Sequence, residues 1–237
     1  MLRFGHSGKM GDILYALPAV AACAPAELYL RPGLAFGEHE ANLLMPLLRA
    51  QPYLSRVTFG SGAEVDVNLD RFRQQDPENN NLVDCHLRLL GLPGSLKDRA
   101  WLSVGSLGEL PAGTVLFGRS LHHVGIDGFW EACMDLFGER ALFVGTEEEH
   151  GIFCKTYGQI PYRPTRDMLE LAGLIKQAAL FVGNQSCPYA IAEGLKRPTV
   201  QHVFLRSPNC VFDRPDSFYV RGQADLDGLS RWWDGQG

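Results

Sequence analysis

The sequence predicts an α/β fold made of two successive domains, residues 1–110 and 111–237. Short apolar segments of strand length alternate with segments of helical period along the chain, which indicates parallel sheets joined by helical crossovers. A stretch rich in glycine and proline, GSLGELPAG at 105–113, separates two runs of this alternation and is the best linker candidate. A chain of 237 residues is long enough for one large or two small domains.

The first domain opens with a strand–helix–strand unit. The stretch LRFGHSGKMGDILYALPAV at 2–20 predicts a short strand, a turn with glycines and a helix, because its later apolar residues recur at helical spacing. ELYL at 27–30 predicts the next strand, and the strand–helix–strand order implies parallel pairing. The other elements expected here are a helix at 41–50, strands at 57–59 and 65–69, a polar loop at 71–81, a helix at 82–90 that places His86 at a surface or half-buried position, and a short strand at 101–104.

The second domain repeats the alternation after the linker. The elements expected there are strands at 114–117, 140–144, 180–182 and 198–200, helices at 129–137, 168–178 and 189–195, and a C-terminal helix that packs through Trp232 and Trp233. Open parallel sheets bind ligands at the carboxyl ends of their strands. We therefore expect the loops that follow the strands to meet at a cleft between the two domains.

Composition narrows the class of protein. Apolar residues make up 46% and charged residues 21%, as in a globular protein with a full core. The formal net charge of −5 disfavours a nucleic-acid-binding surface, although a local basic pocket is compatible with it. The six cysteines are widely spaced without a CxxC pair, which favours reduced thiols and a cytoplasmic location. The sequence shows neither a signal peptide nor an apolar segment of membrane-spanning length.

The turn SGKMGD at 7–12 is the first candidate site. Gly8 and Gly11 permit close approach of a ligand to the backbone, and a helix N-terminus at the end of a strand suits an anion. The turn is not a Walker loop, because Lys9 is followed by Met10 rather than by Ser or Thr, and the GxGxxG dinucleotide fingerprint is absent. The plain alternative is an ordinary strand–helix turn with Asp12 as a cap that contributes about 1 kcal/mol.

Two segments far apart in the chain resemble glycosyltransferase family 9, the ADP-heptose:lipopolysaccharide heptosyltransferases. SGKMGDILYALPAV is similar to the "xGDxLxxxPxL" start of that family. TRDMLELAGLIKQAALFVGNQSCPYAIAEGLKRPTV at 165–200 is similar to its donor segment, with a "gNDSGPxHxA" loop and a "GxPxV" strand. The two matches occur in the order typical of the family, in a divergent and short chain.

The resemblance implies a GT-B fold, in which two Rossmann-like domains with parallel sheets face each other across a cleft. Residues 1–110 would hold the acceptor and residues 111–237 the nucleotide-sugar. The implied reaction is an inverting, metal-independent glycosyl transfer without a cofactor, in which Asp12 is the general base. A helix N-terminus stabilises a carboxylate, so Asp12 is expected to be a weak base that depends on positioning. The implied partners are a nucleotide-sugar and a sugar or glycan acceptor in lipopolysaccharide biosynthesis, with peripheral membrane association through a lipid-linked acceptor.

Further residues are expected to bind the donor or acceptor on the same grounds. They are Ser7, Gly8, Lys9, Gly11, Arg119, Ser120, Thr146, Asn184, Gln185, Ser186, Cys187, Pro188 and Glu193. A leaving diphosphate needs positive potential, which the helix that starts after Pro188 and the side chains of Lys9 and Arg119 can supply. A carboxylate at the place of Glu193 resembles the group that holds ribose hydroxyls. The plain alternatives are solvated charges for Lys9 and Arg119, a helix cap for Ser186 and an exposed helical residue for Glu193.

Three positions depart from the family pattern. Gln185, Cys187 and Ala190 stand where "DSGPxH" has Asp, Gly and His. These changes favour an alternative function, a catalytically inactive GT-B-like protein that binds a nucleotide or glycan, whereas the intact turn ending in Asp12 favours transfer. A nucleotide-sugar hydrolase or epimerase is a further alternative. Thiol chemistry at Cys187 is another, because a helix N-terminus lowers the pKa of a thiol.

Overall fold

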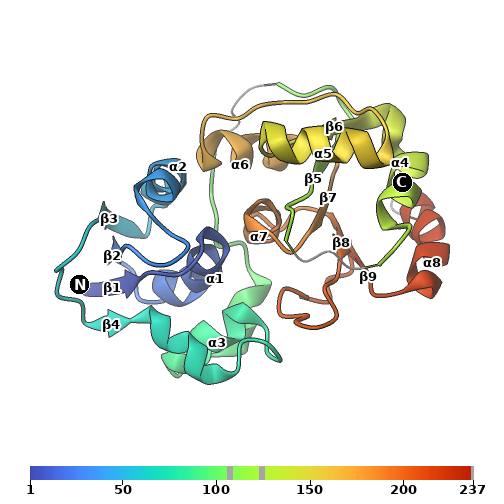
Figure 1. Cartoon of the computed structure of the whole chain (residues 1–237). Helices are drawn as coiled ribbons and strands as arrows, with labels where there is room; N and C mark the ends of the chain where they lie inside the picture. The colour runs from blue at the N-terminus through green and yellow to red at the C-terminus, as the bar shows by residue number, and fades with distance from the viewer. Residues whose placement is uncertain (106–108, 123–125, 236–237) are drawn as a thin grey trace.

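Two separate parallel β-sheets form the framework of the computed structural model, which describes residues 1–105, 109–122 and 126–235 (Figure 1). The N-terminal half of the chain builds one sheet and the C-terminal half builds the other. Every strand pair in the described part of the chain is parallel, as the alternation of strands and helices predicted. The prediction of an α/β fold with two successive units is therefore confirmed.

The first sheet has the strand order β3-β2-β1-β4. Its strands are β1 (Leu2–His6), β2 (Ala26–Leu30), β3 (Leu54–Phe59) and β4 (Val67–Asn68). The helices of this half are α1 (Met10–Ala21), α2 (Glu38–Arg49) and α3 (Leu82–Leu89), with 3₁₀ helices η1 (Leu69–Gln75) and η2 (Gly94–Asp98). The carboxyl ends of β1, β2 and β4 lie at one edge of the sheet, because Phe4 pairs with both Leu28 and Val67.

The second sheet has the strand order β6-β5-β7-β8-β9. Its strands are β5 (Val115–Gly118), β6 (Ala141–Phe143), β7 (Leu180–Asn184), β8 (Thr199–His202) and β9 (Ser217–Val220). Its helices are α4 (Phe129–Phe137), α5 (Glu147–Tyr157), α6 (Met168–Gln177), α7 (Cys187–Gly194) and α8 (Gln223–Asp234), with the 3₁₀ turn η3 (Gly138–Arg140). β7 lies inside the sheet, so its carboxyl end and the start of α7 are central.

Several elements differ from the sequence-based expectation. Helix α5 was not among the expected helices; it begins after Thr146, which forms a capping box with Glu149 through bonds of 2.9 and 3.1 Å. Strand β9 was not among the expected strands, and β4 is shorter than the strand expected at 65–69. The first part of the loop expected at 71–81 belongs to η1.

The segment expected as a strand at 101–104 instead joins the two domains without sheet pairing. The N–H groups of Trp101 and Leu102 both donate to the carbonyl of Gly194 at the end of α7, at 3.0 Å. Lys176 of α6 donates to the carbonyl of Val104 at 2.5 Å. The segment just before the linker predicted at 105–113 is therefore fixed to the second domain. Residues 106–108 of that linker lie outside the described residues.

One of the two hydrophobic clusters of the described residues contains side chains of both domains, and the other belongs to the second domain. Helix α1 packs against α7, and α2 packs against α6, so the two sheets are held together by helices (Figure 1). Ile13 of α1 and Ile191 of α7 belong to the same buried cluster, and the rings of Tyr15 and Phe212 stack at 6.0 Å. Apolar packing between the domains thus fixes the N-terminus of α1 relative to the second sheet.

Gly194→Ala is expected to destabilise the protein even though alanine favours helices over glycine. A Cβ at Gly194 would lie 2.7 Å from Leu102 Cδ1 and 2.8 Å from Trp101 Nε1, so these two side chains must shift, which costs about 1–3 kcal/mol. Gly151→Ala in α5 is the matched control, because the space beside it is open, and it should stabilise by up to about 1 kcal/mol. Urea denaturation measures both changes, and equal effects would contradict this account of the domain contact.

Candidate functional site

Asp12 lies on the first turn of α1, at the carboxyl edge of the first sheet. Its Oδ2 accepts the Lys9 N–H at 3.3 Å and lies 3.8 Å from Arg73 Nη2, and its side chain is 22% exposed. Burial raises the pKa of Asp12 above its ordinary value, although His6 and Arg73 oppose the shift. Burial thus acts against the effect expected from the helix N-terminus, because a raised pKa makes the carboxylate a stronger base.

Asp70, at the start of η1, holds the turn that leads to Asp12. Ser7 donates to it from its backbone N–H at 2.9 Å and from Oγ at 2.8 Å. Arg31 Nη2 lies 3.2 Å from Asp70 Oδ2, and Arg73 Nη1 lies 3.3 Å from Oδ1. Burial alone would raise the pKa of Asp70, but the two hydrogen bonds that Ser7 donates hold it well below its ordinary value. Asp70 is therefore an ionised carboxylate. It follows β4 and binds Ser7 after β1 and Arg31 after β2, so it links the ends of three strands.

Two fully buried histidines lie beneath this turn. His6 Nε2 and His86 Nε2 are 3.4 Å apart, and the Gly8 N–H donates to His6 Nδ1 at 2.9 Å. His86 Nδ1 donates to the Leu82 carbonyl at 2.8 Å, so neutral His86 accepts from His6 through Nε2. Burial lowers the pKa of His86 to about 3. The expectation of a surface or half-buried His86 was thus wrong, because His86 faces His6 across 80 residues of sequence.

Glycine is required at one position of the turn. A Cβ at Gly8 would lie 2.6 Å from His6 Cε1 and 2.9 Å from Asp12 Oδ2. A Cβ at Gly11 would meet no described atom within 4 Å, so the space beside Gly11 is open. Lys9 caps α1 and is exposed. The structure therefore brings Ser7, Gly8, Lys9, Gly11 and Asp12 together as one turn.

On the second domain, Asn184 fixes the loop that follows β5. Its Oδ1 accepts the Ser120 N–H at 3.0 Å, and its Nδ2 donates to the carbonyls of Ser120 at 3.0 Å and His122 at 2.7 Å. The structure thus brings Asn184 and Ser120 together, as expected for neighbouring strand-end loops. Both polar groups of the Asn184 amide are engaged with the chain itself.

Gln185 holds the segment between β8 and β9. Its Nε2 donates to the carbonyl of Ser207 at 2.8 Å and to Asn209 Oδ1 at 3.0 Å, and its Oε1 accepts the Phe204 N–H at 2.8 Å. This segment then reaches the first domain, because Asn209 Nδ2 donates to the Pro77 carbonyl at 2.7 Å. The residue that replaces the aspartate of the family pattern therefore orders a bridge between the domains.

The start of α7 is arranged as a helix cap. Ser186 Oγ accepts the Tyr189 N–H at 3.4 Å and donates to the Asn184 carbonyl at 3.0 Å, and Pro188 lies in the first turn. Burial raises the pKa of the Cys187 thiol to about 12. Thiolate chemistry at Cys187 is therefore disfavoured, since the thiol stays protonated at neutral pH.

Arg119 is a buried cation at the carboxyl end of β5. It is 9% exposed, and its Cζ lies 5.4 Å from the centroid of the Tyr157 ring. Within the described residues, its Nη1 has no hydrogen-bond partner and its guanidinium forms no ion pair with a carboxylate. A buried charge without a partner is costly, so this corner of the second domain favours an anion.

His202 lies near Arg119, at the carboxyl end of β8. It stacks on Phe129 with ring centroids 4.6 Å apart, and its Nε2 accepts the Ile126 N–H. Burial and the positive charge of Arg119 lower the pKa of His202 to about 4, so the ring is neutral at physiological pH. With the lone pair on Nε2, the proton is on Nδ1. The second sheet thus provides a neutral imidazole donor close to the guanidinium.

Two expected donor residues have structural partners. Glu193 is fully buried, and its carboxylate pairs with Lys196 at 2.5 Å and with Arg214 at 3.1 Å. Thr146 caps α5. Glu193 is therefore neither an exposed helical residue nor a carboxylate that is free to hold a ribose, because both of its oxygens are paired within the second domain.

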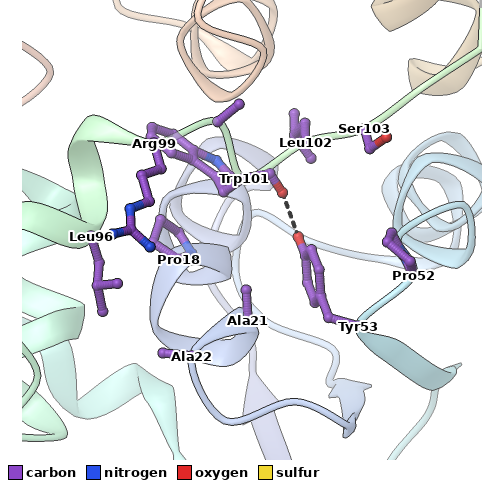
Figure 2. A pocket seen from close by; sticks show the side chains of 11 residues that line it. Pro18, Ala21, Ala22, Pro52, Tyr53, Leu96, Arg99, Trp101, Leu102 and Ser103 are labelled. Atoms are coloured by element: carbon purple, nitrogen blue, oxygen red, sulfur yellow. Dashed lines mark hydrogen bonds between the residues drawn. The ribbon is translucent and has the colours of Figure 1, made fainter.

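A surface hollow of about 360 Å³ lies away from these residues (Figure 2). It is lined by Pro18 and Ala22 at the C-terminal end of α1, by Tyr53 just before β3, by Arg99 after η2, and by Trp101 of the joining segment. The Tyr53 hydroxyl donates to the Trp101 carbonyl at 2.7 Å across it. The hollow contains none of the residues expected to bind donor or acceptor, because it lies at the opposite end of α1 from Asp12.

Sequence reasoning missed the polar side chains that surround the turn at 7–12. His6, Arg31, Asp70 and Arg73 come from the ends of β1, β2 and β4, which are distant in sequence. The sequence feature they share is that each lies at, or a few residues after, the carboxyl end of a parallel strand. Among the described residues, no cluster of three or more His, Cys, Asp or Glu side chains is suited to hold a metal ion, and no helix is both long and apolar enough to cross a bilayer.

Comparison with known proteins supports the fold. No protein-family model and no curated protein sequence matches the chain. A family 9 glycosyl transferase from Veillonella parvula superposes with a TM-score of 0.60 at 12% identity, over 98% of this chain and 89% of the other. The E. coli heptosyltransferase WaaC with ADP-2-deoxy-2-fluoro heptose gives 0.58 at 11%, over 99% of each chain. A putative UDP-N-acetylglucosamine 2-epimerase from Listeria monocytogenes gives 0.54 at 10%, over 99% and 88%. The predicted GT-B-like fold is confirmed.

Asp70→Asn is expected to lower stability in a pH-dependent way. The folded pKa of Asp70 lies below its ordinary value of 3.8, so its contribution is present above that value and is lost as pH falls toward the folded pKa. The variant should lose about 1–2 kcal/mol at neutral pH, and its difference from the parent should shrink in acid. Chemical denaturation at several pH values measures this difference, and a difference independent of pH would contradict it.

Proposed function

We propose that this chain is a nucleotide-sugar glycosyltransferase related to family 9, in which Asp12 is the general base. The main observation behind the proposal is that the Asp12 carboxylate is partly exposed and only loosely held. It lies partly exposed on the first turn of α1 with two long contacts, at 3.3 and 3.8 Å, whereas the neighbouring Asp70 carboxylate is held by several short ones. A carboxylate with a raised pKa and an accessible oxygen suits proton abstraction.

The proposed reaction is an inverting displacement. Asp12 takes the proton of an acceptor hydroxyl as that oxygen bonds to the anomeric carbon of the donor, while the bond from that carbon to the nucleoside diphosphate breaks. Both electrons of the broken bond leave with the diphosphate, whose added charge needs stabilisation. Arg119 and the N-terminus of α7 supply positive potential in the second domain without a metal ion.

The comparisons support this class of reaction. The solved structures with similar folds include heptosyltransferases, one with ADP-2-deoxy-2-fluoro heptose and one in complex with ADP-D-beta-D-heptose. We infer by analogy a nucleotide-sugar donor and a sugar or glycan acceptor for this chain, and we extend the analogy to lipopolysaccharide biosynthesis and a lipid-linked acceptor. The donor sugar and the nucleotide base do not follow from the fold.

A second candidate function is binding without turnover. Both amides of the donor loop are engaged with the chain, Asn184 with Ser120 and Gln185 with the segment 204–209. Glu193 is buried in an ion pair with Arg214 and is not free to hold a ribose. These contacts favour a GT-B-like protein that retains a nucleotide or glycan and lacks transfer. The two variants described next distinguish the candidates.

Asp12→Asn is expected to reduce transfer by about 10²–10⁴-fold, because the amide cannot accept the acceptor proton. Binding of nucleoside diphosphate should stay near that of the parent, because Asp12 belongs to the first domain. Release of diphosphate from a panel of UDP-, GDP- and ADP-sugars measures transfer. Asp135→Asn on the exposed face of α4 is the control. Turnover retained in Asp12→Asn would remove Asp12 from the mechanism.

Arg119→Gln is expected to weaken binding of nucleoside diphosphates by about 10–100-fold, since charge-assisted hydrogen bonds contribute about 1.5–3 kcal/mol. Calorimetric titration with ADP, UDP and GDP measures the affinity. Arg163→Gln, at an exposed position of the same domain, is the control. An unchanged affinity in Arg119→Gln would place the diphosphate elsewhere. Binding that depends on Arg119 together with no transfer by the parent protein would favour the second candidate function.

A further inference from the structure

We propose that Asp70 is a positioning residue for Asp12, because the two carboxylates share the guanidinium of Arg73 and Asp70 holds the turn on which Asp12 depends. The inference rests on the proposed function of Asp12, and it names the group that controls how that carboxylate is presented. Asp70 acts through Arg73 and Ser7 and does not itself contact the reacting atoms.

Arg73 provides the guanidinium that the two carboxylates share. Arg73 Nη1 lies 3.3 Å from Asp70 Oδ1, and Arg73 Nη2 lies 3.8 Å from Asp12 Oδ2. The guanidinium also lies over the Phe72 ring, with Cζ 4.7 Å from the centroid. The Arg73 side chain is 50% exposed, so these partners, rather than tight packing, determine where its charge lies. The shorter contact is to Asp70, which keeps Arg73 from pairing closely with Asp12.

Asp70 is itself held from several strand ends. Its backbone N–H donates to Asn68 Oδ1 at 3.2 Å, and the same oxygen accepts from Arg31 Nη2 at 2.6 Å. Arg31 Nη2 also lies 3.2 Å from Asp70 Oδ2, and Ser7 donates to both Asp70 oxygens. Because β1, β2 and β4 all contribute, Asp70 forms a rigid anchor for the more exposed Arg73.

The arrangement predicts opposite effects of two substitutions on Asp12. Without the Asp70 charge, Arg73 is free to approach Asp12, which favours the ionised form and lowers its pKa. Without the Arg73 charge, the ionised form loses a cation and its pKa rises. The other groups that face Asp12 are His6 from β1, Lys9 from α1 and Cys210 from the segment between β8 and β9. Lys9 and Cys210 keep the same charges in both variants, so they do not reverse the sign between them. His6 also contacts Asp70, with Nδ1 3.2 Å from Oδ1, so the His6 ring is titrated alongside Asp12 in both variants.

The test is an NMR titration of the Asp12 side-chain carboxyl carbon in the full chain, assigned by its loss in Asp12→Asn. Arg73→Gln should raise the apparent pKa by about 1 pH unit, and Asp70→Asn should lower it. Asp70→Glu retains the charge and should return the pKa toward that of the parent. Asp66→Asn removes a carboxylate paired with Arg3 at the exposed edge of the sheet, and it should leave the titration unchanged.

Shifts in the same direction, or no shift in either variant, would overturn the proposal. General loosening of the turn exposes Asp12 to water in both variants and therefore gives the same direction in both. Arg73 is half exposed, so Arg73→Gln is expected to fold and provides a result even if Asp70→Asn does not.

The titration needs no substrate, so it separates this inference from the proposed function. Opposite shifts without any detectable transfer would support the role of Asp70 and reject the glycosyltransferase. Where transfer is detected, Asp70→Asn should lower kcat with little change in KM and should move the acid limb of the pH–rate profile in the direction of the titration. An unchanged acid limb would contradict the positioning role.

Discussion

The packing of α1 against α7 is the constraint on which the rest of this structure depends. It merges residues of both sheets into one buried core, so the two domains are joined by apolar contact as well as by the chain. The bonds from Trp101 and Leu102 to Gly194 reinforce this contact at the end of α7. The N-termini of the two helices, with Asp12 on one and Ser186 on the other, are thereby held in a fixed relation.

The two halves of the candidate site differ in the chemical groups that they present. In the first domain, the turn at 7–12 presents the carboxylate of Asp12, whose contacts are long, next to charged groups that are closely paired with one another. In the second domain, the polar side chains of the loop at 184–186 mostly bind the chain itself, and Arg119 and His202 are the groups that offer donors. The proposed transfer therefore rests more on the turn at 7–12 than on the loop at 184–186.

The order of strands and helices could be predicted from the sequence because each element depends on residues close together in the chain. The periods of the apolar residues marked most strands and helices, and the turn at 7–12 follows from its glycines and Asp12. The missed features depend on contacts between distant segments. His86 is buried because it meets His6, Asp70 gains its role from Arg31 and Arg73, and Gln185 bonds to a segment about twenty residues further on. Helix α5 was missed although its capping box, Thr146 with Glu149, is readable in the sequence.

Native-state hydrogen exchange tests the central claim, that the two domains form one cooperative unit through α1 and α7. The amides of Trp101 and Leu102 donate across the domain boundary, and those of Phe4 in β1 and Val182 in β7 lie inside the sheets. The account predicts that all four exchange only with an opening free energy close to that of global unfolding. Exchange of the Trp101 and Leu102 amides at a much lower free energy than the sheet amides would show that the domains separate readily and would contradict it.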